Sequence, residues 1–315
     1  MTISGNWKLG LILSLTTALM WGFLPISLIP LFGVMDPYTI TFYRLAGGGL
    51  LLFFWLLSRK HKPSKIKFSL RVVSLLFIAI LSICGNYLYW LKGLELTSPA
   101  TSQVVIQVAP MLLILGSVLI FKEPFSKKQF IGTLIFIVGL LLFFNQRLAG
   151  LLSEFSGYNL GVFYVLFSSL LWAIYALAQK SLLKDFQAIE LIFIIVSVGA
   201  CLYIPFATPS KIMELNSLQL SMLLFGAVNT AVAYGCFTEA MRHWEVSRVS
   251  AIVATVPILT LALSFLQYRF FPSILPEESF NILSIAGAIV VVVGSAITAL
   301  SKNPSKTDKA YIDYD

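Results

Sequence analysis

The sequence predicts an all-α, polytopic membrane protein with ten transmembrane helices. Its 315 residues are 58% hydrophobic and only 11% charged, with a mean hydropathy of +0.89, whereas about a quarter of the residues in soluble domains are charged. The apolar runs are long and uninterrupted, unlike the alternating strands of a membrane barrel. Helices satisfy their own backbone hydrogen bonds in lipid, and ten crossings of roughly 20 residues leave no room for a separate soluble domain.

Ten apolar runs, delimited by charged residues, proline and glycine, are the expected spans. They lie near residues 9–30, 36–58, 70–93, 99–121, 128–147, 160–180, 187–207, 217–241, 247–271 and 279–300. The first run follows Lys8 as the apolar part of a signal peptide would, but no small-x-small cleavage pattern comes after it, so we expect it to be retained. Residues 301–315 are polar and contain Asn303-Pro304, which predicts a disordered tail.

The basic residues predict how these spans are oriented. Of the 22 Lys and Arg residues, Arg44 lies inside a span, and 17 of the other 21 fall on one set of loops and span ends. The other set carries only Lys92, Arg147, Lys211 and Arg269. Because cytoplasmic loops carry an excess of basic residues, both termini are expected in the cytoplasm of an inner (plasma) membrane protein. The net charge of +8 therefore reflects orientation, and we expect no nucleic-acid partner.

The chain also contains a weak internal repeat. Matched residues recur in the same order at separations of 147 to 155 positions: Gly10 and Gly161, Trp21 and Trp172, Tyr87 and Tyr234, Pro110 and Pro257, Gly132 and Gly287, and Gly139 and Gly294. Five spans per repeat is an odd number, so the second copy must enter the membrane from the opposite face, as in many secondary transporters. This predicts two repeats, 1–150 and 151–300, followed by the cytoplasmic tail 301–315.

Several short motifs resemble those of the drug/metabolite transporter superfamily, specifically the EamA type with two five-helix units. They are Ala18-Leu19-Met20-Trp21-Gly22, Arg44, Tyr87 through Leu94, Pro110, Lys122-Glu123-Pro124, Gly132 and Gly139. The family usually carries a glutamate after the ninth span, where this chain has Arg269-Phe270-Phe271. The resemblance implies a transporter that exports metabolites.

The acidic residues argue against an enzyme. No pair of acids lies inside a span, and the nearest, Glu190 and Glu239, sit close to helix ends. His61 and His243 fall in basic loops, where we expect them to be solvated. The sequence shows no paired carboxylates, metal-ligand cluster or Ser/His arrangement, so we expect no catalytic residues, metal or cofactor. For the same reason, transport is not expected to be obligatorily proton-driven.

Arg44 lies about eight residues inside the second span, at a depth that is costly for a charge. One interpretation is that it anchors an anionic or carboxylate-bearing substrate. The other is a structural tie to backbone carbonyls or a neighbouring helix, and Gly47-Gly48-Gly49 nearby favours close helix packing.

Polar and aromatic residues in the spans predict a substrate cavity. Gln103, Gln107 and Pro110 share one helix face, and the two amides can bond either to another helix or to a substrate. With Arg44, the expected substrate-binding set is Trp21, Asn86, Tyr87, Gln103, Gln107, Trp172, Tyr175, Asn229 and Tyr234. We expect Trp21 with Tyr87, and Trp172 with Tyr234, to gate opposite ends of the cavity; ordinary packing is the alternative.

Two further features are expected to be structural. Ser126 to Gln129 reads as a capping box. The glycines at 132, 139, 287 and 294 form close-packing faces, either within the bundle or in a homodimer.

The function predicted from these features is transport of small organic metabolites, with efflux of amino-acid-like or amphipathic solutes by alternating access. A channel-like facilitator is the main alternative, and a membrane-embedded enzyme a weaker one. The expected partners are a small-molecule substrate and the lipid bilayer.

Overall fold

A computed structural model describes residues 6–59, 69–122, 125–148, 150, 156–243, 246–271 and 280–301. All regular structure in these ranges is helical. The α-helices are α1 (Trp7–Leu28), α2 (Pro37–Ser58), α3 (Leu70–Leu96), α4 (Pro99–Val105), α5 (Val108–Phe121), α6 (Lys127–Phe143), α8 (Gly157–Leu182), α9 (Ala188–Tyr203), α10 (Ser217–His243), α11 (Val246–Val253), α12 (Val256–Phe270) and α13 (Ile282–Leu300). Two short 3₁₀ helices, η1 (Ile29–Leu31) and η2 (Pro209–Glu214), follow α1 and α9. His61, Glu123 and the predicted tail beyond Ser301 lie outside the described residues.

Within the described residues, eight helical segments are long and apolar enough to cross a membrane. They include α4 with most of α5 as one segment, Pro99–Ile120, and most of α11 with α12 as another, Arg248–Phe270. The predicted spans at 128–147 and 187–207 correspond to shorter helices, α6 with 17 residues and α9 with 16. The prediction of an all-helical, multi-pass membrane protein is confirmed.

Side-chain caps fix where many of the helices begin. Asp36 accepts hydrogen bonds from the backbone N–H groups of Tyr38 and Thr39, and Pro37 occupies the first position of α2. Ser69, Ser98, Ser156 and Asn281 cap α3, α4, α8 and α13 in the same way. The predicted capping box at Ser126 and Gln129 is present in full. Such caps satisfy N–H groups that a helix leaves unpaired at its first turn.

The expected spans over 99–121 and 247–271 are present as apolar helical segments, but each is interrupted near its middle, which the apolar runs do not predict. The first breaks at Ile106-Gln107, between α4 and α5, and the second at Ala254-Thr255, between α11 and α12. Pro110 and Pro257 lie just after these breaks and lack the N–H that would continue the helical ladder. Around the second break, Ile258 N–H bonds to the Thr255 carbonyl, and this leaves the Ala254 carbonyl free for another donor.

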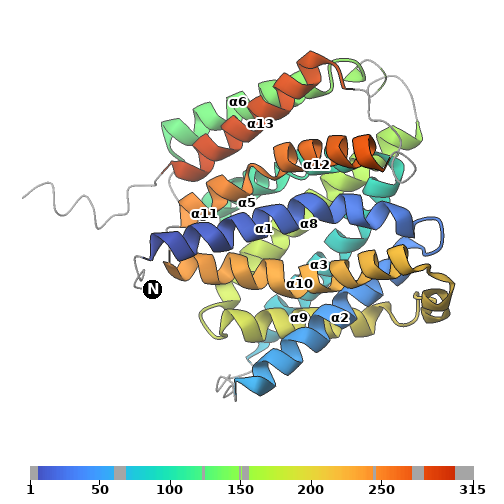
Figure 1. Cartoon of the computed structure of the whole chain (residues 1–315). Coiled ribbons are helices and arrows are strands. Elements are labelled where there is room, and N and C mark those ends of the chain that lie inside the picture. The colour runs from blue at the N-terminus through green and yellow to red at the C-terminus, as the bar shows by residue number, and fades with distance from the viewer. Residues whose placement is uncertain are drawn as a thin grey trace, which may run out of the picture.

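Helices from the two parts of the chain pack against each other in pairs. α1 packs on α10, α2 on α9, α3 on α8 and α6 on α13, and Figure 1 shows the α6–α13 pair on one side of the bundle with α2 and α9 on the opposite side. Each pair joins a helix that precedes residue 150 to one that follows it. The core is therefore built across the two parts, and side chains such as Phe54 and Leu119 are left exposed on the outer face, as expected for contact with lipid.

The regularly spaced glycines have a packing role within the chain. A Cβ atom added to Gly139 would lie 2.5 Å from the Val291 backbone nitrogen, and one on Gly294 would lie 2.5 Å from the Phe136 nitrogen. Gly132 and Gly287 also lie against the partner helix. The structure supports close packing within the bundle as the role of these glycines, because the glycine face of α6 packs directly against the glycine face of α13.

Candidate functional site

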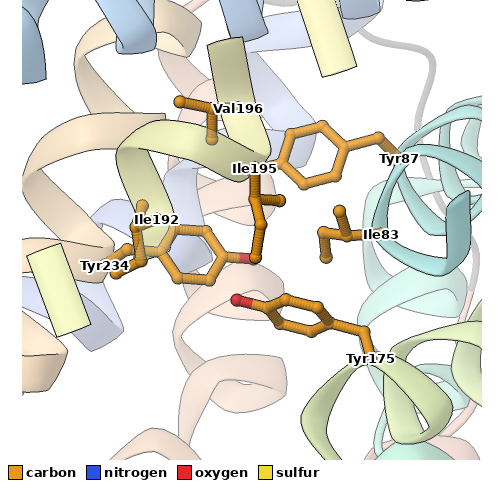
Figure 2. A pocket seen from close by; sticks show the side chains of 7 residues that line it. All are labelled: Ile83, Tyr87, Tyr175, Ile192, Ile195, Val196 and Tyr234. Carbon is orange, nitrogen blue, oxygen red and sulfur yellow. The ribbon is translucent and has the colours of Figure 1, made fainter. Parts of the chain in front are cut away.

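An enclosed cavity lies where α3, α8, α9 and α10 meet. Its lining residues are Ile83, Tyr87, Tyr175, Ile192, Ile195, Val196 and Tyr234. Figure 2 shows the hydroxyl groups of Tyr175 and Tyr234 entering this space from different helices, beside the ring of Tyr87. The centres of water molecules have only about 10 Å³ to occupy, which is about the room that one water needs. This conformation is therefore closed around the cavity.

The three tyrosines were expected in the site and do come together. Tyr87 comes from α3, Tyr175 from α8 and Tyr234 from α10, so both parts of the chain contribute. Tyr87 and Tyr175 are buried. Tyrosine offers an apolar ring together with a hydroxyl that needs a partner when buried. The cavity therefore combines apolar walls with polar tips.

Arg44 adjoins this tyrosine cluster from α2. Its side chain is 3% exposed, and the guanidinium carbon lies 4.6 Å from the centre of the Tyr87 ring and 5.9 Å from that of Trp90. Both distances are within the range of cation–π attraction. The methylene stem packs against Gly226 of α10, where an added Cβ would lie 3.2 Å from Arg44 Cγ. Aromatic rings on one side and a glycine on the other thus hold the charge inside the bundle.

The hydrogen-bond donors of Arg44 are not all satisfied. Nε and Nη1 are both buried and have no hydrogen-bond partner among the described residues. Within the same residues, no aspartate or glutamate forms an ion pair with Arg44. A structural tie to backbone carbonyls was one interpretation of this arginine, and the structure shows no such tie for these two atoms.

The four expected amide residues bond to other helices and do not line the cavity. Asn86 Nδ2 donates to the Ser168 carbonyl at 3.0 Å, and Asn229 Nδ2 donates to the Met20 carbonyl at 2.7 Å. Gln103 Nε2 donates to the carbonyl of Trp21 at 2.9 Å. That carbonyl is available because Pro25, four residues later in α1, has no N–H to bond it. These amides therefore join helices.

Gln107 makes the most informative of these bonds. It lies at the break between α4 and α5, and its Nε2 donates to the Ala254 carbonyl at the break between α11 and α12, at 2.9 Å. Both residues are buried. A side chain at one interrupted helix thus satisfies a backbone group that the other interruption leaves free.

The aromatic residues expected to gate the cavity contact other partners, and their gating role stays a prediction. Trp21 contacts Tyr234, with ring centres 5.3 Å apart, and not Tyr87. The reason is that α1 packs on α10. Trp172 is partly buried and packs against the core cluster that contains Tyr87 and Tyr175. The rings of Tyr87, Tyr175 and Tyr234 line a single cavity.

Sequence reasoning missed the apolar wall of the cavity. Ile192, Ile195 and Val196 recur with helical spacing on α9, and Ile83 faces them from α3. Their spacing is a usable signal for one helix face. However, α9 is apolar on nearly every side, so the sequence alone does not show which face meets the cavity.

The acids and histidine outside the cavity have local roles. Glu190 accepts a hydrogen bond from Gln187 N–H at the start of α9. His243 was expected in a solvated loop, but it is the last residue of α10, and its Nε2 lies 3.2 Å from Glu239 Oε1.

Comparisons with known proteins identify a family and several proteins that this chain resembles in sequence and fold. The sequence model described as the EamA-like transporter family matches residues 8–145 and 159–300. A relative from Escherichia coli (strain K12), named "Uncharacterized inner membrane transporter YhbE", is 34% identical over 293 residues, which cover 93% of this chain and 91% of the relative. An "Uncharacterized transporter" of Haemophilus influenzae is 32% identical over 295 residues, covering 93% and 95%. A solved crystal structure with 17% identity has a TM-score of 0.65 over 94% of this chain and 97% of its own, and it shows the same fold.

Proposed function

We propose that this chain, which belongs to the EamA-like transporter family, is a carrier that moves small organic solutes across the inner membrane by alternating access between two inverted five-helix repeats. The family membership and the names of the relatives make it a membrane transporter. The number of crossings, the inverted symmetry, the direction of transport and the mechanism are our proposals.

Ten crossings follow if α6 and α9 span the membrane as well. Helices of 17 and 16 residues rise about 24–26 Å, close to the ~30 Å hydrocarbon core. α6 packs along α13 and α9 packs along α2, and both partners are long enough to cross. A helix that lies alongside a spanning helix at this length traverses the same apolar layer.

The packing pattern supports an inverted repeat of residues 1–150 and 151–300. In this repeat, α1 corresponds to α8, α10 to α3, and α12 to α5. α1 packs on α10 and α12, while α8 packs on α3 and α5, so each contact has its counterpart. The two interruptions also correspond, because Gln107 and Ala254 have the same separation as Tyr87 and Tyr234. Transporters of this kind bind substrate between their repeats, near interrupted helices.

The closed cavity is the single observation that most directly supports a carrier mechanism. Its walls come from α3 in the first repeat and from α8, α9 and α10 in the second. Movement of one repeat against the other would open such a cavity to one side at a time. A permanently open pore needs no enclosed space between the repeats.

The distribution of basic residues supports cytoplasmic termini. α1 begins and α13 ends on the same side of the bundle (Figure 1), and most of the loop lysines and arginines belong to that side. We propose efflux as the direction of transport, because the family resemblance implies export.

Counterflow in proteoliposomes tests the proposal. The purified chain is reconstituted, and uptake of labelled solutes is measured with and without unlabelled solute inside. A carrier gives saturable uptake that internal solute stimulates. Non-saturable flux without stimulation would favour the channel-like facilitator.

A further inference from the structure

We infer that the central site recognises an organic monocarboxylate, whose negative charge is bound by Arg44 and whose apolar part occupies the adjoining cavity. This inference rests on the proposed carrier function and specifies its substrate class. It draws on the unsatisfied arginine donors, the charge balance around them and the chemistry of the cavity wall.

The first step concerns the donors of Arg44. Nε and Nη1 together carry three of the five N–H groups of the guanidinium, and neither atom has a partner among the described residues. Buried donors without partners are costly, and those of a charged group cost most. These N–H groups are therefore available to an acceptor that a ligand supplies.

The second step concerns charge. Arginine stays protonated in proteins, and burial of an uncompensated charge is strongly unfavourable. Among the described residues, the faces of the Tyr87 and Trp90 rings lie beside the guanidinium, and no aspartate or glutamate pairs with it. A water molecule can accept an N–H bond but brings no charge. An anionic ligand satisfies both requirements.

The third step selects a carboxylate among anions. A carboxylate carries one negative charge, which balances one arginine, and its two oxygens match the planar fork of the guanidinium. The hydroxyl groups at the cavity can donate to the same anion. A phosphate monoester would bring close to two charges, and the described part of the site offers no second cation to it.

The fourth step concerns the rest of the ligand. Ile83, Ile192, Ile195 and Val196 supply the aliphatic part of the cavity lining, interspersed with the tyrosine rings. These surfaces suit a compact aromatic or branched aliphatic group in a conformation more open than this one, in which the space holds about one water. The described residues provide no carboxylate at the cavity for an ammonium group. We therefore expect an acid to bind more tightly than its matching amide or amine.

Binding of phenylacetate, phenylacetamide and phenethylamine to the purified full-length chain tests the substrate class. Thermal unfolding is followed in buffers of low chloride content, with each compound titrated separately and sodium chloride as a further titrant. Phenylacetate is expected to raise the unfolding temperature most, because a ligand that binds the folded state stabilises it. This series uses the unaltered protein, so it does not depend on a variant that folds.

Two substitutions then assign the effect to Arg44. Arg44→Gln should weaken phenylacetate binding by roughly tenfold to 100-fold, the range for a charged hydrogen bond, without lowering the unfolding temperature of the ligand-free protein. Arg147→Gln is the matched control, because Arg147 is exposed and lies over Tyr158, away from the cavity. It should bind phenylacetate as the unaltered protein does.

Several results would overturn the inference. They are equal binding of the acid and the amide, an equal rise with chloride alone, no binding of phenylacetate, or unchanged phenylacetate binding by Arg44→Gln. A marked drop in the ligand-free unfolding temperature of Arg44→Gln would restore the structural interpretation.

Counterflow measurements with the same compounds distinguish failure of the carboxylate inference from failure of the proposed carrier function. If internal solute stimulates uptake of the amide or the amine while the acid is not taken up, the carrier function is supported and the carboxylate substrate class is contradicted. Flux that internal solute never stimulates would remove the carrier itself.

Discussion

At the scale of single residues, the position of Arg44 depends on what surrounds its stem. Gly226 leaves space that the stem occupies, and the rings of Tyr87 and Trp90 lie beside the guanidinium. The charge is thus fixed by packing, while three of its N–H groups remain available. A substitution at Gly226 should move the charge without removing it.

Gly226→Ala should weaken carboxylate binding several-fold, because the new methyl group would lie 3.2 Å from Arg44 Cγ and displace the arginine stem. The measurements are phenylacetate titration and thermal unfolding. Gly235→Ala on the same helix is the control, since a Cβ there meets no atom within 4 Å. Equal effects of the two substitutions would mean that the helix responds to lost flexibility and not to displacement of Arg44.

At the scale of elements, the two interrupted helices are joined by one bond. Gln107 donates to Ala254, and each residue belongs to a break that the sequence analysis did not predict. The bond stabilises the closed arrangement and has to adjust if the repeats move against each other. Its loss should therefore affect both stability and rate.

Gln107→Met keeps the side-chain length and removes the donor, so the Ala254 carbonyl loses its partner. We expect a loss of about 1–3 kcal/mol in the free energy of unfolding, together with a changed exchange rate in counterflow. Gln146→Met is the control, because Gln146 is exposed. Unchanged stability and rate in Gln107→Met would show that the bond has no role in the closed state.

The glycine contact between α6 and α13 gives a second prediction for elements. Gly139→Ala would place a methyl group 2.5 Å from the Val291 backbone nitrogen, and backbone atoms cannot rotate away as a side chain can. The unfolding temperature should fall, at a cost of about 1–3 kcal/mol, with the oligomeric state unchanged in size-exclusion chromatography. Dissociation of a dimer without a loss of stability would instead support the homodimer interpretation.

Much of the helical layout could be predicted from the sequence, because hydrophobic runs and caps are local signals. The capping box at Ser126 is an example. The sequence also singles out the three tyrosines that line the cavity. The helix breaks could not be placed, because Pro110 and Pro257 also occur within continuous membrane helices whose neighbours satisfy the freed groups. The partners of Trp21 and Asn86 depend on which helices pair, and single-sequence patterns do not encode that pairing.

At the scale of the whole molecule, the distribution of basic residues predicts the orientation in the membrane. A single cysteine replacing Lys211, on the exposed 3₁₀ helix after α9, should react with an impermeant maleimide in intact cells. One replacing Lys184, between α8 and α9, should react only after permeabilisation. Cys84, Cys201 and Cys236 are first replaced by serine or alanine. The opposite labelling pattern would reverse the topology.

The acids bear on energy coupling. Glu239 lies near the end of α10, beside His243, and outside the cavity lining. We therefore expect Glu239→Gln to change rate or folding more than the pH dependence of transport. Solute-driven acidification inside liposomes that this substitution abolishes would establish proton coupling.

The central claim, that the cavity opens to one side at a time, is tested most directly by labelling a single cysteine in place of Ile195 from each side of the membrane. The Tyr38→Ala substitution removes a ring that contacts Phe206 at 5.9 Å, between α2 and the turn after α9. This weakens the end of the bundle that we assign to the outside. Alternating access predicts faster labelling from outside and slower labelling from inside. Equal acceleration from both sides, or labelling that does not respond, would contradict it.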